Sequence, residues 1–461
     1  MSKGTKILIC IWLPIYTALL GFTLNNTLPI KGDESFYIAS SIEMLESGEY
    51  LVPDFYGELR FQKPPLTYWL TLLGYKIFGI NLWSGRLFFL LLACGLLILV
   101  YKFALLILPS TEFAILPVLL LSSSTLFIEF ARVSMTDMPL AFFTTLALYC
   151  FVRALQYPTR MKRYYFYAYI STSLAFLSKG PLAFFPCLAI AIYLLYRRPD
   201  NYKKHFYQLF HPYNLAVFAL LALTWYLYVY ISYTEEFIKQ FGRESSDSLF
   251  SNMKNIFENL IFYLRILGTY IFPFALISVY VYIKRRNKIP SKLLPVIYFI
   301  CVAFTFLVIF LSRHKARYML VIFPALTLVI GYIVYNSNFR KIAVSIAVGV
   351  TGIQLAIFLI YPLIGGNPLK EITHYWQDNI GPNLGTYKLS RKTTSILAAL
   401  SHGSVGRDDE TCRYLVMDVK YLDHFKNPII LKRATQISKV RIEKGKIVKK
   451  YRTYVLIDKG I

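Results

Sequence analysis

Reactive side chains gather between the first two apolar runs of the chain. Asp33 and Glu34 stand together, and Lys63 follows in the same stretch. Carboxylates and ammonium groups are costly beside hydrocarbon, by roughly 2.5 to 3.5 kcal/mol each at the centre of a membrane span and less toward its edge. A carboxylate can act as a general base, and an ammonium group pairs with phosphate oxygens. The three residues therefore suit chemistry on a lipid phosphate at a bilayer surface.

Asp33 has two interpretations. It directly precedes a segment, from Phe36 to Leu45, in which apolar residues recur every third position, as in a short helix lying in the membrane interface. Aspartate is among the best helix N-cap residues, so its carboxylate could simply cap that helix. Alternatively, Asp33 is a general base that takes the proton of an acceptor hydroxyl or amine, with Glu34 orienting rather than reacting.

Lys63 and Arg265 are candidates for binding a lipid phosphate. Pro64 and Pro65 follow Lys63, force an extended chain and would hold its ammonium group at a defined depth. A lipid phosphate offers anionic oxygens at that depth. Arg265 lies about two turns into its own apolar run from the outer side. For both residues the alternative is a side chain that snorkels to the headgroups.

Asp137 and Lys179 are charged residues at the junctions of apolar runs. Asp137 begins one run and is followed by Pro139, which is also ordinary helix-start chemistry. Lys179 stands between two runs that leave almost no room for a loop. Substrate contact and a hinge with a snorkelling cation are both open for it.

A basic cluster follows a later apolar run, on the side that is otherwise poor in basic residues. An exception to the charge rule for membrane loops suggests an anionic ligand, although non-specific headgroup binding is the alternative. The cluster and the aromatic residue beside it are Arg313, Lys315, Arg317 and Tyr318.

The composition predicts an all-α, multi-pass membrane protein. Hydrophobic residues make up 56% of the 461 residues and charged residues only 16%, which is more apolar surface than a water-soluble domain hides. About eleven runs approach the length of a membrane span. They cover 7–24, 87–108, 113–131, 138–155, 164–178, 181–196, 214–233, 259–283, 293–312, 317–335 and 342–361.

Basic residues concentrate in alternate loops, which predicts a cytoplasmic N-terminus. An odd number of spans then places the first loop, 25–85, and the tail on the outer side. Most of the net charge of +25 belongs to the inner loops or the tail, so it does not indicate nucleic-acid binding. Membrane lipids are expected around the spans.

The tail differs in character from the rest of the chain. Short strand-like segments begin at Tyr414, Pro428 and Tyr454, which predicts a small exported α/β domain over 362–461 after a membrane domain over 1–361. Interfacial helices are expected within 25–85, the second over Leu66 to Phe78, where Tyr and Trp are frequent. We find no internal repeat of the kind that many transporters carry.

Neither a metal site nor a cofactor is predicted. The six histidines are scattered without ligand spacing, and the chain has no Gly-rich phosphate loop or nucleotide fingerprint. A cytoplasmic nucleotide sugar is therefore not the expected donor.

With these residues in place, the chain resembles the GT-C fold glycosyltransferases that use polyprenyl-phosphate sugars, the group of protein O-mannosyltransferases and lipid A aminoarabinose transferases. The resemblance covers about the first 330 residues. It is carried by Gly32-Asp33-Glu34, Gly48-Glu49-Tyr50-Leu51-Val52-Pro53, Lys63-Pro64-Pro65-Leu66-Thr67-Tyr68-Trp69, Phe78-Gly79, Arg86-Leu87, Thr136-Asp137-Met138, Leu177-Ser178-Lys179-Gly180-Pro181, Arg317-Tyr318-Met319 and Phe323-Pro324-Ala325-Leu326.

The resemblance implies a sugar transfer with inversion, from an isoprenoid phosphate carrier to lipid A, a glycan or a protein. It places this reaction at the outer face of a bacterial inner membrane. It implies that Asp33 serves the acceptor or reacting centre, Lys63 lies at the carrier phosphate and Asp137 is a second acidic group. Where aminoarabinose transferases have Glu and His, this chain has Gln62 and, by approximate alignment, Ser245, which argues against bound zinc and against that sugar. A transporter or flippase of lipid-linked sugars is the alternative.

Overall fold

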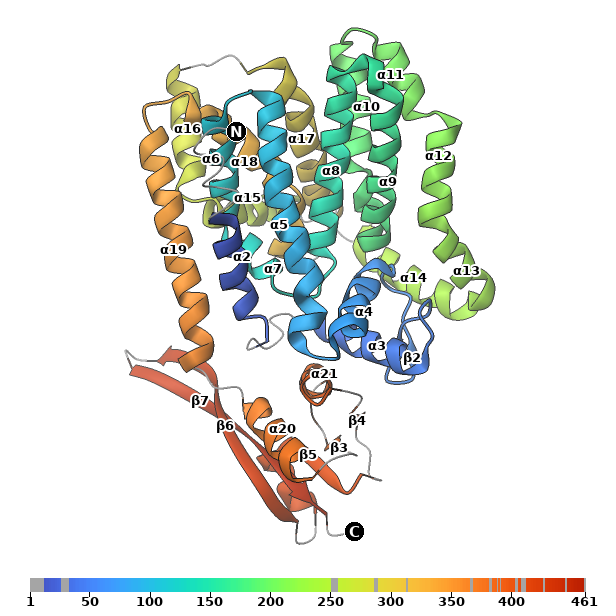
Figure 1. The fold of residues 1–461 in the computed structure, drawn as a ribbon, viewed down its shortest axis with the longest axis vertical. Coiled ribbons are helices and arrows are strands. Elements are labelled where there is room, and N and C mark those ends of the chain that lie inside the picture. Colours follow the sequence, from blue (N-terminus) through green and yellow to red (C-terminus); the bar gives the residue numbers. More distant parts are fainter. Residues whose placement is uncertain are drawn as a thin grey trace. The chain divides into compact units, whose positions relative to one another are not determined.

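The structure is a computed structural model, and most of its described residues are helical (Figure 1). Contacts divide the chain into two compact units. Unit 1 comprises Met1–Ala18, Arg60–Thr67 and Phe89–Gln354, and unit 2 comprises Leu19–Leu59, Tyr68–Phe88 and Leu355–Ile461. The described residues are 12–25, 33–249, 256–285, 289–311, 314–364, 368–380, 384–387, 389, 391–402, 405–407, 412–425, 428–443 and 446–459.

The predicted helical membrane protein is confirmed, because several described helices are long and apolar enough to cross a bilayer. Six pass this test: Leu82–Ile107, Asp137–Gln156, Pro158–Arg197, Tyr202–Ser232, Ser291–Phe310 and Arg340–Ile357. The broken pair Ile256–Tyr270 and Phe274–Lys284, bent by 99°, would be a seventh. Shorter apolar helices cover Leu13–Phe22, Thr111–Ser122 and Phe323–Tyr335. The count of eleven spans stays a prediction.

A helical hairpin in unit 1 is formed by α8 (Asp137–Gln156) and α9 (Met161–Lys179), which pack along each other (Figure 1). A single turn of 3-10 helix over Pro158–Arg160 joins them, so the start of α8 and the end of α9 lie at the same end of the hairpin. Gly180, with a left-handed φ of 69°, ends α9. The chain then continues into α10 (Phe185–Arg197), which packs on α17 (Leu294–Phe310).

Unit 2 begins with the first loop. Both helices predicted there are confirmed as helices, α3 (Glu34–Ser47) and α4 (Leu66–Phe78). Between them β1 (Asp54–Phe55) pairs with β2 (Glu58–Leu59) in a small antiparallel hairpin.

The tail contains a five-stranded sheet in the order β4-β3-β5-β7-β6. The parallel strands are β3 (Leu384–Tyr387), β4 (Gly406–Arg407) and β5 (Tyr414–Asp418), and the antiparallel ones are β6 (Ile429–Glu443) and β7 (Lys446–Asp458). The helices of the tail are α20 (Pro368–Asn379) and α21 (Arg391–Leu400). The segments predicted as strands from Tyr414, Pro428 and Tyr454 correspond to β5, β6 and β7.

The first loop and the tail share one buried core within unit 2. Ile38 and Ile42 of α3 belong to the same cluster as Leu397 of α21, Val416 of β5 and Leu456 of β7. The apolar pattern that predicts an interfacial helix thus marks a face packed against protein. The division into 1–361 and 362–461 stays a proposal for where the membrane part of the chain ends.

Gly74 permits the close packing of α4 against the start of the next helix, α5 (Leu82–Ile107). A Cβ atom at Gly74 would lie 2.0 Å from the backbone oxygen of Ser84, whereas one at Gly349 would meet nothing within 4 Å. We expect Gly74→Ala to destabilise the protein by roughly 1–3 kcal/mol, because a backbone atom must move. Gly349→Ala should be neutral or slightly stabilising, since alanine favours helices. Thermal unfolding of both variants in detergent tests this, and equal melting temperatures would contradict the packing.

Glu43 contacts the first-loop hairpin through a carboxyl group whose pKa is raised. Its two oxygens accept from the backbone N–H of Tyr56 at 3.0 and 3.1 Å. Burial, and then a hydrogen bond with Asp54, raise the pKa of Glu43 to about 8. Between pH 4.5, the ordinary pKa of a glutamate, and about pH 8, the folded chain holds a proton that the unfolded chain has released. Stability due to Glu43 is therefore present at low pH and falls as pH rises through this window.

Glu43→Gln should raise the apparent melting temperature at pH 8 and change it little at pH 5, because the amide cannot ionise. Glu49→Gln is the matched control, since Glu49 is exposed. Melting curves of the three proteins at both pH values check this. A gain for Glu43→Gln that is equal at pH 5 and pH 8 would contradict the assigned shift.

Candidate active site

A buried ion pair joins the start of α8 to the end of α9, at the end of the hairpin away from the Pro158–Arg160 link. Lys179 Nζ donates to Asp137 Oδ1 at 2.5 Å, and the two side chains are 7% and 2% exposed. Thr136 occupies the N-cap position of α8, so Asp137 is the first helical residue and not the cap. Because Lys179 is buried against a carboxylate, it does not snorkel into the headgroup region.

Further cations surround this pair. The Nζ atom of Lys179 lies 4.4 Å from the centre of the Tyr318 ring, and the guanidinium of Arg317 lies 5.8 Å from the same ring. Lys63 and Arg317 are close enough to repel the charge of Lys179. Three cations and one carboxylate of unit 1 thus meet, and the excess of positive charge favours an anion there.

Some polar atoms in and beside this cluster are buried without a hydrogen-bond partner among the described residues. Asp137 Oδ2 and the hydroxyl of Tyr263, which interacts electrostatically with Tyr318, are examples. A buried polar atom that lacks a partner costs roughly 1–3 kcal/mol. A bound ligand or an ordered water would supply such a partner.

A second buried ion pair lies in unit 2. Arg86 donates from Nε to Glu34 Oε1 at 2.7 Å and from Nη2 to Glu34 Oε2 at 2.9 Å, and both side chains are 0% exposed. Its Nη1 also donates to the backbone oxygen of Leu24 at 2.8 Å. This two-pronged geometry fixes Glu34, which points to a positioning role. Sequence reasoning gave Arg86 no role, although an arginine one turn into an apolar helix signals a buried partner.

Asp33 stands immediately before this ion pair. It is half-buried at the N-cap position of α3, and its side chain makes no capping hydrogen bond. Its backbone oxygen accepts from the N–H of Phe36 at 3.2 Å. The structure therefore does not support the interpretation in which the Asp33 carboxylate caps α3.

The structure brings together Lys63, Asp137, Lys179, Arg317 and Tyr318 in unit 1. Asp33 and Glu34 belong to unit 2.

The other predicted residues lie apart or outside the described chain. Arg265 is exposed on α15 (Ile256–Tyr270), and Lys315 is half-buried before the 3-10 turn Ala316–Val321. Arg313 and the side chain of Ser245 fall outside the described residues. In the described part of the chain, no three His, Cys, Asp or Glu residues are grouped so that they could hold a metal ion.

Residues 14–237 match the family described as dolichyl-phosphate-mannose-protein mannosyltransferase. An uncharacterized protein of Aquifex aeolicus (strain VF5) is 34% identical over 314 residues, which is 67% of this chain and 60% of that protein. A protein of Proteus mirabilis (strain HI4320), named undecaprenyl phosphate-alpha-4-amino-4-deoxy-L-arabinose arabinosyl transferase 2, is 30% identical over 215 residues, or 45% of this chain and 37% of that protein. The chain thus spans less than two thirds of either relative.

The crystal structure of ArnT from Cupriavidus metallidurans bound to undecaprenyl phosphate has a similar fold. The TM-score is 0.77 at 16% identity, over 98% of both chains. The likeness extends through the tail as well as the helical part. The chain therefore shares the fold of this ArnT structure, and its residues 14–237 are similar in sequence to the protein mannosyltransferase family.

Proposed function

We propose that the chain is an inverting glycosyltransferase that moves a sugar from a polyprenyl monophosphate carrier to an acceptor at the outer face of a bacterial inner membrane. The observation that carries the proposal is the buried Asp137–Lys179 pair with Lys63 and Arg317 beside it. Such a site attracts a phosphate at the end of a membrane helix. The Proteus relative and the ArnT crystal structure support it, because both names include undecaprenyl phosphate.

In the proposed reaction, an acceptor hydroxyl or amine attacks the anomeric carbon of the donor sugar. The bond from that carbon to the phosphate oxygen breaks, and the electron pair leaves with the carrier phosphate. Asp33 takes the proton of the acceptor, and Arg86 holds Glu34 beside it. Lys63, Lys179 and Arg317 stabilise the negative charge on the departing phosphate.

Asp137 makes the cluster of cations possible. Three like charges repel one another strongly where water is scarce, and a buried carboxylate offsets part of that repulsion. Its hydrogen bond also fixes the direction of the Lys179 ammonium group, while the Tyr318 ring covers that group from another side. Arg265, Arg313 and Lys315 remain candidates for phosphate binding on the sequence argument alone.

A flippase of lipid-linked sugars would need ionisable groups near the middle of its spans. Here Asp137 begins α8 and Lys179 ends α9, so the charges sit at helix ends. This placement favours a transferase. Lipid A, a surface glycan and an exported protein are the acceptors that the proposal covers, with the N-terminus cytoplasmic and the tail on the outer side.

Asp33→Asn should reduce transfer of radiolabelled sugar from a polyprenyl phosphate by roughly 10²-fold or more, because the amide cannot take a proton. Binding of the carrier should persist, since the cations are unchanged. Asp200→Asn, at an exposed position, is the matched control and should transfer normally. Transfer by Asp33→Asn at the wild-type rate would remove Asp33 from the mechanism.

Variants of the Asp137–Lys179 pair can distinguish a role in phosphate binding from a role in stability. Lys179→Met alone leaves a buried carboxylate without its partner, so the melting temperature should fall. Adding Asp137→Asn should recover most of that loss while carrier-phosphate binding stays at least tenfold weaker than in the wild type. Thermal unfolding and carrier titration of the single and double variants check both expectations. Recovery of binding together with stability would show that the pair is only structural.

A further inference from the structure

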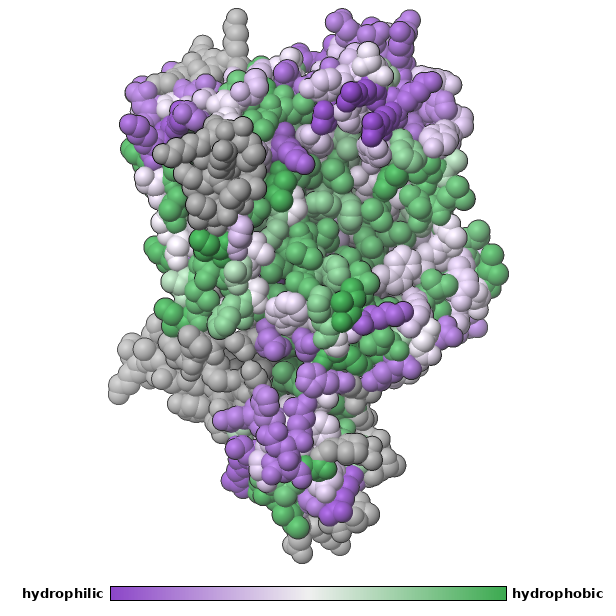
Figure 2. Space-filling view, in the orientation of Figure 1, coloured by the Kyte–Doolittle hydropathy of each residue, from purple (hydrophilic) through white to green (hydrophobic). Residues whose placement is uncertain are grey.

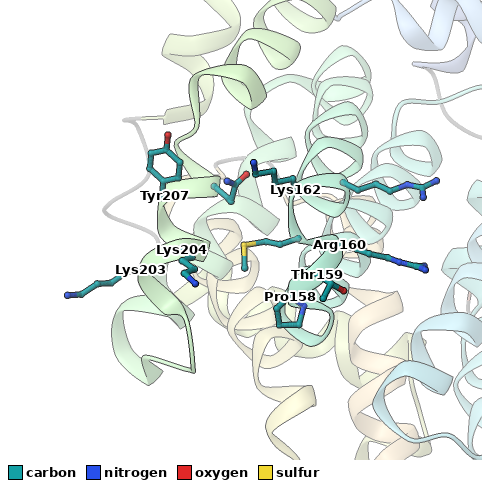
Figure 3. Close-up of a pocket in the computed structure, with 10 residues that line it drawn as sticks. Pro158, Thr159, Arg160, Lys162, Lys203, Lys204 and Tyr207 are labelled. Carbon is teal, nitrogen blue, oxygen red and sulfur yellow. The ribbon is translucent and has the colours of Figure 1, made fainter.

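A basic pocket of about 700 Å³ lies in unit 1, beside the start of α9 and α11 (Tyr202–Leu209) (Figure 3). In Figure 3, Arg160 and Lys162 come from one segment, and Lys203 and Lys204 come from the facing one. The lining residues are Pro158, Thr159, Arg160, Met161, Lys162, Arg163, Lys203, Lys204, Tyr207 and Gln208. Five of these ten side chains are cationic, and none is anionic.

These five cations also lack nearby counter-charges. Within the described part of the chain, no carboxylate lies within 4.0 Å of any of them, in contrast to Lys179 at the other end of α9. Like charges that line one pocket repel each other, and an anion bound among them would relieve that repulsion. The pocket is therefore suited to a phosphate group, which can accept several charge-assisted hydrogen bonds at once.

The position of the pocket relative to the membrane indicates which molecule would supply that phosphate. The 19 residues of α9 separate the pocket from Lys179 by about 27 Å, close to the roughly 30 Å of a hydrocarbon core. Aromatic residues gather at this end: Tyr167 accepts from Arg163 Nε at 3.0 Å, and the exposed Tyr207 and Tyr213 stand nearby in sequence. Tyrosines of this kind mark the headgroup level of a bilayer.

Figure 2 agrees with this placement, because hydrophilic residues gather around α11 whereas hydrophobic residues cover the sides of the helices. Basic residues are expected at the inner ends of spans for orientation alone. Orientation needs only their charge, however, and gives no reason for two segments to enclose a cavity. The buried side chains of Met161 and Gln208 form part of its wall.

We propose that this pocket binds the phosphate headgroup of an anionic membrane phospholipid, on the side of the membrane opposite to the Asp137–Lys179 pair. Pockets of basic residues between membrane helices, on the inner side, are suited to such headgroups. The bound lipid would tie the α8–α9 link to α11. The site does not depend on the proposed transfer reaction, because it needs neither the sugar donor nor Asp33.

The test titrates the full-length protein in detergent with phosphatidylglycerol, with phosphatidylcholine and with inorganic phosphate, and follows bound lipid by native mass spectrometry. The variant is Lys162→Gln/Lys203→Gln/Lys204→Gln. The control, Lys102→Gln/Lys292→Gln/Lys341→Gln, removes the same charge from exposed positions on the same predicted side of the membrane. If the triple variant does not yield folded protein, Lys204→Gln alone takes its place.

We expect phosphatidylglycerol, but not phosphatidylcholine, to bind the wild type, and the pocket variant to bind it at least fivefold more weakly than the control. Equal weakening in both variants would overturn the proposal in favour of a general charge effect. Displacement of phosphatidylglycerol by low millimolar inorganic phosphate would also overturn it, because the site would then recognise phosphate without the lipid. Sugar transfer is not measured, so failure of the proposed reaction would leave this result unaffected.

Discussion

A charge that leaves water needs a counter-charge close by, and this constraint organises the protein. Two buried pairs satisfy it, Glu34 with Arg86 and Asp137 with Lys179. Each joins helix ends that are well separated in sequence, so each pair also fixes the local course of the chain. Removing one partner of a buried pair typically costs about 3–5 kcal/mol, because the other charge is then stranded. The two pairs therefore hold both the first loop and the α8–α9 hairpin in place.

The hairpin has a different electrostatic character at each end. Near Lys179, the cations lie beside the Asp137 carboxylate and the ring of Tyr318. The carboxylate offsets part of the positive charge, and its hydrogen bond orients the Lys179 ammonium group. Near Met161, the five basic residues that line the pocket have no described carboxylate beside them. The first arrangement suits a phosphate whose charge changes during a reaction, whereas the second suits one that stays bound.

Sequence reasoning reached the helical architecture because a membrane span is a local property. A run such as Leu82–Ile107 is recognisable from its own composition. The common location of Asp137 and Lys179 also follows from local information, since a short link between two spans returns the chain to the same surface. Their pairing did not follow, because a lysine at a span end reads equally well as a snorkelling side chain.

The core shared by the first loop and the tail could not be predicted from any local pattern in the sequence. Ile38 and Ile42 repeat at helical spacing, which identifies an apolar face but not what covers it. Arg86 was missed for a related reason, since its partner Glu34 is distant in sequence and was assigned to chemistry. Long-range contacts of this kind depend on how the whole chain folds.

The packing of α3 against α21 has a consequence for how the protein is made. The ribosome completes α3 hundreds of residues before α21, and elongation at about 5–20 residues per second delays the partner by roughly tens of seconds. During that delay the apolar face that carries Ile38 and Ile42 has no tail to cover it. Until synthesis of the tail is finished, this face therefore lacks most of the core that covers it in the folded protein.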